Sequence, residues 1–277
     1  MPAIRPELFP KALASGADAI CFDLEDGVPE ERKTEAREIL AEFLGSIHTP
    51  AHPAFLVRVN QTDSAHLSSD IEVAIKNSVA IIALPKIERV SQVQHVCECI
   101  ASIERERGAK EPVALLLTIE SPGGLRLASE LAQSSPRVIG LQVGFADLLE
   151  PLGILSTDSF ARNQIRLMLR LAAAEANVPC FEAAYPLIND EQGLLNQLQS
   201  ARSLGFSGAS CIHPGQIGIA NRIFTPTAEE IEYAEGVVNA AAEEAARGHA
   251  IARYRGQMVD RPFLLRAKAM LSFKNQK

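Results

Sequence analysis

The stretch VALLLTIE, residues 113–120, is a continuous apolar run that ends at an acidic residue, Glu120. Polar and apolar residues do not alternate along the run, so a β-strand here would have both faces buried. Strands of this kind are typical of parallel sheets that are covered by helices. The stretch therefore predicts an α/β fold with a carboxylate at the carboxyl end of one strand.

Similar apolar runs alternate with segments of helical period along the rest of the chain. The other predicted strands cover residues 17–24, 54–59, 80–84, 138–143, 178–184 and 209–212. The predicted helices cover residues 5–14, 29–44, 68–77, 90–107, 125–133, 160–176, 191–204 and 216–223. This alternation predicts a TIM (β/α)8 barrel over residues 1–224, a fold that typically takes about 250 residues, rather than an open doubly wound sheet.

The first strand of this barrel is truncated or missing, because only residues 1–4 precede the first predicted helix. Either a short stub takes its place, or the sequence begins inside the true first strand. An absent strand would leave the barrel open and weaken the floor beneath Asp23 and Glu25.

Residues 225–277 exceed what a barrel needs and predict a C-terminal helical extension. An alanine-rich helix over residues 228–246 is followed by a glycine-containing link, residues 252–259, and by a final helix from Pro262. Such an extension packs on its own barrel or on a neighbouring subunit. We expect the second arrangement, in a homo-oligomer.

The charge balance disfavours several classes of partner. The 277 residues include 27 Lys and Arg against 34 Asp and Glu, a formal net charge of -7, which argues against binding to nucleic acid or anionic membranes. No apolar run approaches the roughly 20 residues that span a bilayer, and residues 1–10 lack the pattern of a secretory signal. We expect a cytoplasmic protein that acts on small molecules and keeps its five cysteines reduced.

Polar residues at the ends of the predicted strands form a candidate site, because TIM barrels carry their reactive groups at this edge. They are Asp23, Glu25, Asp26, Arg58, Asn60, Lys86, Glu88, Glu120, Asp147, Glu182 and His213. Any one of them alone could be a helix cap or a salt-bridge partner. Several carboxylates that converge on one edge repel one another unless a cation is present, and this favours a divalent metal.

Glu120 and Asp147 follow consecutive strands and are the predicted metal ligands. Oxygen ligands with open water positions suit magnesium or manganese better than zinc. Asp23, Glu25 and Asp26 would act through metal-bound waters or by orienting their neighbours.

Three basic residues complete the predicted site. Arg58 offers a planar cation that can bind a carboxylate at two points, and a metal with an arginine suits a 2-oxo acid. Lys86 is interpreted as a cation at the strand ends rather than a Schiff-base nucleophile, because a metal would already supply the electrophile. His213 would either contact substrate or make a structural hydrogen bond, and the sequence leaves both open.

Seven motifs follow one another along the chain: DLEDGV at residues 23–28, RVN at 58–60, LPK at 84–86, IESPGG at 119–124, GFADL at 144–148, IHP at 212–214 and GQMVD at 256–260. In this order they resemble the HpcH/HpaI aldolase/citrate lyase family. The chain is most similar to its citrate lyase beta-subunit-like branch, which also includes malyl-CoA and citramalyl-CoA lyases. The similarity runs from about Arg5 to the last helix.

The resemblance implies a magnesium-dependent carbon–carbon lyase that cleaves a 3-hydroxy-acyl-CoA into acetyl-CoA and a 2-oxo acid. It implies that Glu120 and Asp147 hold the magnesium and that Arg58 binds the 2-oxo acid carboxylate. Coenzyme A would enter as part of the substrate.

The resemblance also places Gly144, Phe145 and Ala146 against the substrate. In related lyases an aspartate from the C-terminal segment of a neighbouring subunit exchanges a proton with the acyl methyl carbon, and Asp260 matches that position. The family typically forms trimers in which these segments are exchanged.

Other interpretations remain at this point. The coenzyme A site has no sharp signature: Arg5, Lys11 and Lys33 could meet its phosphates, although solvated positions on a helix are the simpler interpretation. An aldolase for free hydroxy acids, a subunit of a citrate-cleaving complex, and a catalytically silent barrel that binds an acyl-CoA or an organic acid are the alternative functions.

Overall fold

The computed structural model describes residues 1–47, 53–77, 79–108 and 111–274, with the side chains of residues 273 and 274 left out. The described chain divides into two compact units, Met1–Arg222 and Ile223–Lys277.

The first unit is built on a seven-stranded parallel sheet whose strands follow one another in chain order. The strands are β1 (Ala19–Asp23), β2 (Ala54–Arg58), β3 (Ile81–Leu84), β4 (Ala114–Ile119), β5 (Val138–Val143), β6 (Cys180–Glu182) and β7 (Gly208–Ala209). Each strand matches one of the predicted apolar runs, so the predicted α/β fold with a parallel sheet is confirmed. All carboxyl ends therefore lie along one edge.

The strand β4 shows why the run at residues 113–119 folds as predicted. Leu115, Leu117 and Ile119 are fully buried on one face, and Leu116 packs with Leu56 and Phe181 on the other. Both faces are covered, as a parallel sheet under helices requires.

A short stub pairs with the outer edge of β1. Pro2 forms a parallel bridge to Asp23. The Asp23 N–H donates to the Met1 carbonyl at 2.8 Å, and the Ala3 N–H donates to the Asp23 carbonyl at 2.9 Å. A short stub therefore lies where the first strand was expected.

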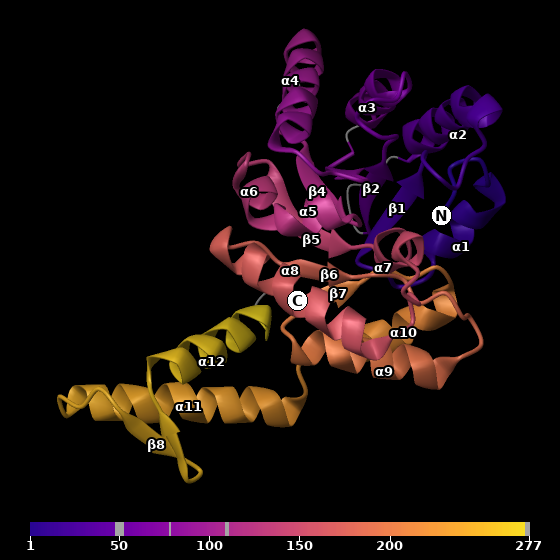
Figure 1. Cartoon of the computed structure of the whole chain (residues 1–277). Helices are drawn as coiled ribbons and strands as arrows, with labels where there is room; N and C mark the ends of the chain where they lie inside the picture. The colour runs from indigo at the N-terminus through magenta and orange to yellow at the C-terminus, as the bar shows by residue number, and fades with distance from the viewer. Residues whose placement is uncertain (48–52, 78, 109–110, 275–277) are drawn as a thin grey trace. The chain divides into compact units, whose positions relative to one another are not determined.

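The helices connect the strands on the outside of the sheet. They are α1 (Phe9–Leu13), α2 (Lys33–Ser46), α3 (Leu67–Lys76), α4 (Val90–Arg107), α5 (Pro122–Arg126), α6 (Ala128–Gln133), α7 (Phe145–Leu149), α8 (Ser159–Glu175), α9 (Glu191–Ser203) and α10 (Pro214–Phe224), with 3-10 turns η1 (Pro6–Leu8), η2 (Glu30–Arg32) and η3 (Glu150–Leu152). Figure 1 shows α2, α3 and α4 side by side, on the same side of the strands labelled β1, β2 and β4.

Two local predictions need correction. The single helix expected over residues 125–133 is two helices, because the backbone leaves the helical region at Leu127, with φ -106° and ψ 14°. The helix α7 was not predicted, since five residues are too few to show a helical period.

The second unit contains α11 (Ala228–Ala246), the strands β8 (Ala252–Tyr254) and β9 (Gln257–Val259), and α12 (Arg261–Lys274). The predicted glycine-containing link over residues 252–259 connects α11 to α12 and forms an antiparallel hairpin, which the sequence did not predict. Its two turn residues, Arg255 and Gly256, have φ 46° and 81°, as a two-residue hairpin turn requires. Residues 275–277 of the predicted extension lie outside the described residues.

The hairpin packs on α11 through a tyrosine. A Cβ on Gly236 would lie 2.1 Å from the Tyr254 ring, so only glycine lets this ring reach the helix. Ala234, Val237 and Val259 form part of the buried core of this unit.

Within the described residues, no helix has the length and apolar content needed to cross a membrane. The five cysteines are free thiols, as expected.

Candidate active site at the carboxyl ends of the strands

Asp23, the last residue of β1, holds Arg58, the last residue of β2. The two residues are register partners, and Asp23 accepts hydrogen bonds from Arg58 Nε at 2.8 Å and Nη2 at 2.7 Å. The backbone N–H groups of Glu25 and Gly27 donate to the same carboxylate, both at 2.9 Å. Burial opposes ionisation of Asp23, but these four donors outweigh it and lower its pKa. Asp23 is therefore a fixed anion that orients the guanidinium.

Arg58 retains binding capacity after this pairing. A guanidinium has five N–H groups, and Asp23 uses one on Nε and one on Nη2. Nη1 lies 3.1 Å from Glu25 Oε2. Burial would lower the pKa of Arg58, but Asp23 and Glu25 outweigh it and raise the pKa. The sequence analysis expected Arg58 to bind a substrate carboxylate at two points, but in the structure one such two-point contact is made to Asp23. The N–H groups of Nη1 and the second N–H group of Nη2 are left for a ligand.

Glu25 is a buried carboxylate between two cations. Its exposure is 2%, and its oxygens lie 3.1 Å from Arg58 Nη1 and 2.9 Å from Lys86 Nζ. Neither contact has the alignment of a hydrogen bond, so both oxygens lack a hydrogen-bond donor. The backbone beneath is fixed by Lys33, whose Nζ donates to the carbonyls of Leu24 at 2.8 Å and Glu25 at 2.7 Å.

Lys33 is therefore neither a phosphate ligand nor a solvated helix residue, and both sequence interpretations of it are wrong. It is 5% exposed and serves as a clamp under the turn after β1. Arg5 and Lys11 are exposed, as the simpler interpretation expected.

Lys86 contacts the site with both its backbone and its side chain. Its φ of 51° places it in the left-handed region, which is unusual for a residue other than glycine. Its N–H donates to Glu120 Oε1 at 2.8 Å, and its Nζ lies 3.1 Å from Asp26. Burial would lower the pKa of Lys86, but Glu25 and Asp26 outweigh it and raise the pKa. A lysine held in its charged form is a poor nucleophile, which agrees with its interpretation as a cation.

Glu120 is the most perturbed carboxylate at this edge. It is 5% exposed, and burial raises its pKa to about 7, with the nearby carboxylates of Asp147 and Glu25 adding to the effect. The Lys86 N–H and Arg58 act in the opposite direction. A Cβ on Gly144 would lie 2.6 Å from Glu120 Oε2, so glycine leaves the room that this oxygen occupies.

Asp147 lies near Glu120 because the two residues follow neighbouring strands, β5 and β4. Ile119 and Val143 are register partners, and the Gly144 N–H donates to the Ile119 carbonyl at 3.0 Å. The short helix α7 then presents Asp147 with an exposed side chain. Within the described part of the chain, no hydrogen bond or ion pair is made by its carboxylate.

These groups fit a hard divalent cation that is held by two carboxylates. The Asp147 carboxylate raises the cost of ionising Glu120, and a cation between the two carboxylates relieves that cost. Among the described residues, no group of three or more His, Cys, Asp or Glu side chains is arranged to hold a metal. The remaining ligands would therefore be water and substrate oxygens, as magnesium prefers.

Several strand-end residues have other roles. Glu182 is fully buried and pairs with Arg166 of α8. His213 accepts a hydrogen bond from the Gly215 N–H at 3.1 Å, which is one of the two roles that the sequence left open. Asn60 is buried and donates to Leu24 and Asp70.

The sequence reasoning missed Asp70 altogether and missed the supporting role of Lys33. Asp70 is fully buried on the apolar face of α3 and accepts from Arg37 Nη1 at 3.0 Å. The sequence could have indicated that Asp70 is buried, because it is an acidic residue within the apolar stripe of a predicted helix. Lys33 carried no such signal, because its partners are carbonyl groups.

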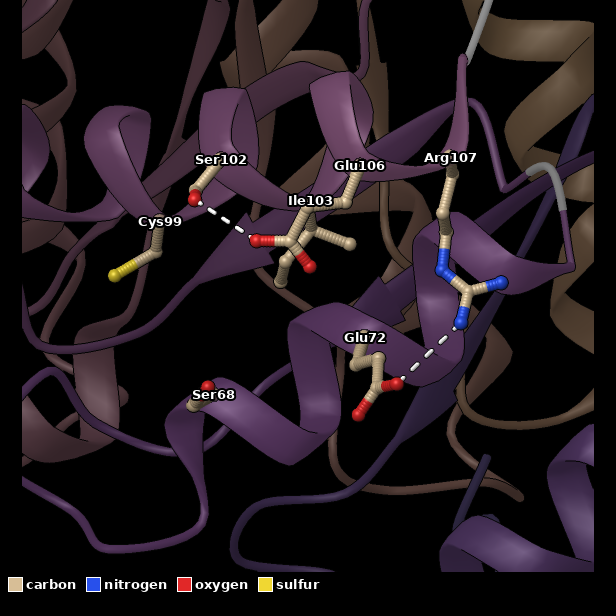
Figure 2. Close-up of a pocket in the computed structure, with 7 residues that line it drawn as sticks. All are labelled: Ser68, Glu72, Cys99, Ser102, Ile103, Glu106 and Arg107. Atoms are coloured by element: carbon tan, nitrogen blue, oxygen red, sulfur yellow. Dashed lines mark hydrogen bonds and ion pairs between the residues drawn. The ribbon is translucent and has the colours of Figure 1, made fainter.

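A surface hollow lies apart from these residues. Figure 2 shows it between α3 and α4, lined by Ser68, Glu72, Cys99, Ser102, Ile103, Glu106 and Arg107. Its polar groups pair with one another, Arg107 with Glu72 and Ser102 with Glu106. None of the strand-end residues lines it, so the chemistry of the strand ends, rather than this hollow, defines the candidate site.

The comparison with known families now decides the relationship. The family model of HpcH/HpaI aldolase/citrate lyase matches residues 1–214. The chain belongs to this family. The resemblance drawn from the seven motifs is thereby confirmed, and the matched range contains the first six of them, while Asp260 lies beyond it.

Individual relatives match almost the whole chain. Citrate lyase subunit beta of Leuconostoc mesenteroides subsp. cremoris is 32% identical over 282 residues, which cover 99% of this chain and 91% of that protein. The (3S)-malyl-CoA thioesterase of Cereibacter sphaeroides is 30% identical over 273 residues, covering 98% and 92%. The crystal structure of CitE from Mycobacterium tuberculosis in complex with magnesium, acetoacetate and coenzyme A is 31% identical, with a TM-score of 0.78 and coverage of 98% and 95%.

Proposed function

We propose that this chain is a magnesium-dependent carbon–carbon lyase. Its substrate would be a 3-hydroxy-acyl-CoA such as citramalyl-, malyl- or citryl-CoA, and its products acetyl-CoA and a 2-oxo acid. The observation that carries the proposal is Glu120, a buried carboxylate with a pKa raised to about 7 beside a second carboxylate, Asp147. The relatives named for citrate lyase and malyl-CoA chemistry, and the CitE structure with magnesium and coenzyme A, support it.

The fold proposed for this function is a (β/α)8 barrel over residues 1–224 with a helical extension over residues 225–277. Seven parallel strands in chain order and the stub at Pro2 support it, because the stub extends the edge where the first barrel strand belongs.

Glu120 and Asp147 would hold the magnesium ion. When bound, the ion supplies the positive charge that stabilises the oxyanion of the 3-hydroxyl group as that group becomes a ketone. Manganese, which has the same preference for oxygen ligands, would substitute for it. Asp23, Glu25 and Asp26 would orient the cations Arg58 and Lys86 around this pair.

Arg58 would bind the carboxylate of the 2-oxo acid through the N–H groups that Asp23 leaves. Its charge is assured by the raised pKa, and Asp23 fixes the plane of the guanidinium before substrate arrives. Gly144 and Ala146, with the backbone of Phe145, would line the same substrate site, since they lead from the strand β5 to Asp147. The Phe145 ring itself is buried under α8 and faces away from substrate.

As the carbon–carbon bond breaks, a base would take the proton of the 3-hydroxyl group. Asp260, in its acid form, would protonate the departing acetyl-CoA enolate, so that one proton is removed and one is supplied. Among the described residues its Oδ1 has no hydrogen-bond partner, so no internal contact commits this oxygen to a structural role. We propose that it acts in the site of a neighbouring subunit of a homotrimer.

A subunit role in a citrate-cleaving complex is the second candidate, and the relative from Leuconostoc favours it because that protein is named as a subunit. The two candidates differ in the substrate that the isolated chain accepts. Citramalyl-CoA, malyl-CoA and citryl-CoA are offered separately to the purified chain with magnesium, and release of acetyl-CoA and of the 2-oxo acid is followed by chromatography.

Cleavage that stops on addition of EDTA supports the lyase. Cleavage of citryl-CoA alone supports the subunit role. Turnover of free hydroxy acids without coenzyme A would instead identify the chain as an aldolase. Thioester hydrolysis without carbon–carbon cleavage would identify it as a thioesterase. Binding of coenzyme A in calorimetry without any turnover would identify it as a binding protein.

A further inference from the structure

A buried arginine pair lies behind the segment that carries Asp147. Arg162 and Arg166 belong to α8 and are 8% and 2% exposed. Their guanidinium carbons lie 4.4 and 5.2 Å from the centroid of the Phe145 ring. Phe145 begins α7 and is itself 3% exposed, so both cations face a ring that is shielded from water.

The two arginines carry two positive charges but share only one carboxylate among the described residues. Glu182 accepts from Arg166 Nε at 2.9 Å and from Nη2 at 2.8 Å, but lies 3.5 Å from Arg162 Nη2. Arg162 also donates to Gln197 at 2.6 Å, while its Nε is buried with no hydrogen-bond partner. Among the described residues, Glu182 is the acidic side chain that pairs with either arginine. One carboxylate thus serves two buried cations.

The Phe145 ring therefore contributes part of what stabilises Arg162. A cation over an aromatic face gains most when both are removed from water, as they are here. Burial lowers the pKa of Arg162, which shows the same shortage of partners. Loss of the ring would free α7 from α8 at this point.

The position of Asp147 depends on this contact between Phe145 and the arginine pair. Its exposed carboxylate makes no hydrogen bond or ion pair within the described chain, so its place beside Glu120 is set by the backbone of α7. That backbone is tied to the strand β4 by the Gly144 N–H and to α8 by the Phe145 ring.

We propose that Arg162 and Arg166 are positioning residues, which stack on Phe145 to hold α7 where Asp147 can share a divalent cation with Glu120. This inference rests on the proposed metal site. It assigns to the arginine pair a role beyond packing α8 on the sheet.

The test is titration of Mn²⁺, followed by electron paramagnetic resonance, into the full chain and three variants. Phe145→Leu removes the ring face without a change of charge. Arg162→Met removes one cation and leaves the neutral pair of Arg166 and Glu182. Phe181→Leu is the matched control, because it removes a ring from the core cluster around Leu116. Thermal unfolding without metal gives the stability of each variant.

We expect Phe145→Leu to bind Mn²⁺ about 10-fold more weakly than wild type, the usual effect of changing a group that supports a metal ligand. Phe181→Leu should bind within about twofold of wild type whatever its stability. The direction of the change in Mn²⁺ affinity in Arg162→Met separates two explanations. Loss of a positive charge alone would tighten binding of a cation, whereas loss of positioning weakens it.

Unchanged or tighter binding in Arg162→Met would overturn the inference while leaving the metal site intact. Equal weakening in Phe145→Leu and Phe181→Leu would also overturn it, because general destabilisation would then suffice. If Phe145→Leu does not fold, Arg162→Met decides. Absence of Mn²⁺ binding by wild type would instead overturn the proposed function, and this inference with it.

Discussion

Gly144 lies against the carboxylate of Glu120, and a Cβ at this position would sit 2.6 Å from both Cβ and Oε2 of Glu120. Real side chains do not approach so closely, so Gly144→Ala must push the carboxylate aside. We expect this variant to lose at least 10-fold in Mg²⁺ affinity by calorimetry, since a ligand displaced by even a fraction of an ångström changes the coordination geometry.

Gly218→Ala in α10 is the matched control for this substitution. A Cβ there meets nothing within 4 Å, so metal affinity should be unchanged and stability should rise by about 0.5–1 kcal/mol from the higher helix propensity of alanine. Normal Mg²⁺ affinity in Gly144→Ala would show that Glu120 Oε2 takes no part in the site.

Glu120→Gln should change how stability depends on pH. Mainly through burial, the pKa of Glu120 rises from 4.5 to about 7 in the folded chain. Between these pH values the folded chain holds the proton more tightly than the unfolded chain. The contribution of Glu120 to the free energy of unfolding therefore falls as pH rises from about 4.5 to 7, by about 3 kcal/mol at most, and the loss is complete above pH 7.

Glutamine cannot ionise, so the Glu120→Gln variant does not lose this part of the free energy of unfolding as pH rises. In urea unfolding with EDTA, Glu120→Gln should be more stable than wild type at pH 8, with the difference disappearing toward pH 4.5. At one fixed magnesium concentration, the ion should stabilise wild type at pH 8 more than it stabilises the variant, because the variant binds the ion more weakly. Two parallel curves of stability against pH would contradict the raised pKa.

Asp23→Asn should disturb substrate binding without removing any group that touches substrate. An amide offers one acceptor oxygen where the carboxylate offers two to Arg58, and it places an N–H against a donor. We expect a loss of about 1–3 kcal/mol in stability and a KM for the 2-oxo acid, in the condensation direction, raised more than kcat is lowered. An unchanged KM would mean that Arg58 does not bind the carboxylate of the 2-oxo acid.

A mixture of two variants tests whether Asp260 acts in a neighbouring subunit. Glu120→Gln and Asp260→Asn should each be nearly inactive alone, with metal binding intact only in the second. If a site combines Glu120 of one subunit with Asp260 of another, random mixed oligomers from co-expression restore both groups in about a quarter of the sites. Activity near that fraction is expected. No recovery would place both residues in the same chain.

The sheet could be predicted from the sequence because each strand is short, apolar and buried on both faces. The positions of Glu120 and Arg58 followed from the same rule, since a polar residue that ends such a strand must emerge at the carboxyl edge. The pairing of Asp23 with Arg58 could not be predicted, because it depends on the register between two strands that only the assembled sheet sets. The left-handed backbone of Lys86, which directs an N–H to Glu120, has no local sequence signal.

The supporting residues were the hardest to predict. Lys33 and Asp70 looked like ordinary charged helix residues, and each is buried with a hydrogen bond to a backbone group of the preceding strand end, Leu24 for Lys33 and Asn60 for Asp70. The hairpin in the second unit was missed because its three-residue strands are too short to show alternation, although Arg255 and Gly256 mark its turn.

The central claim is that Glu120 and Asp147 share one divalent ion, and Mn²⁺ titration of the single variants tests it most directly. Wild type should bind one ion per chain, and Glu120→Gln and Asp147→Asn should each weaken binding by 10-fold or more, roughly the loss expected when a charged ligand is removed. Glu42→Gln, which removes an exposed carboxylate of α2 outside the candidate site, should bind as wild type does. Equal affinity in all four proteins, or no binding by wild type, would contradict the account.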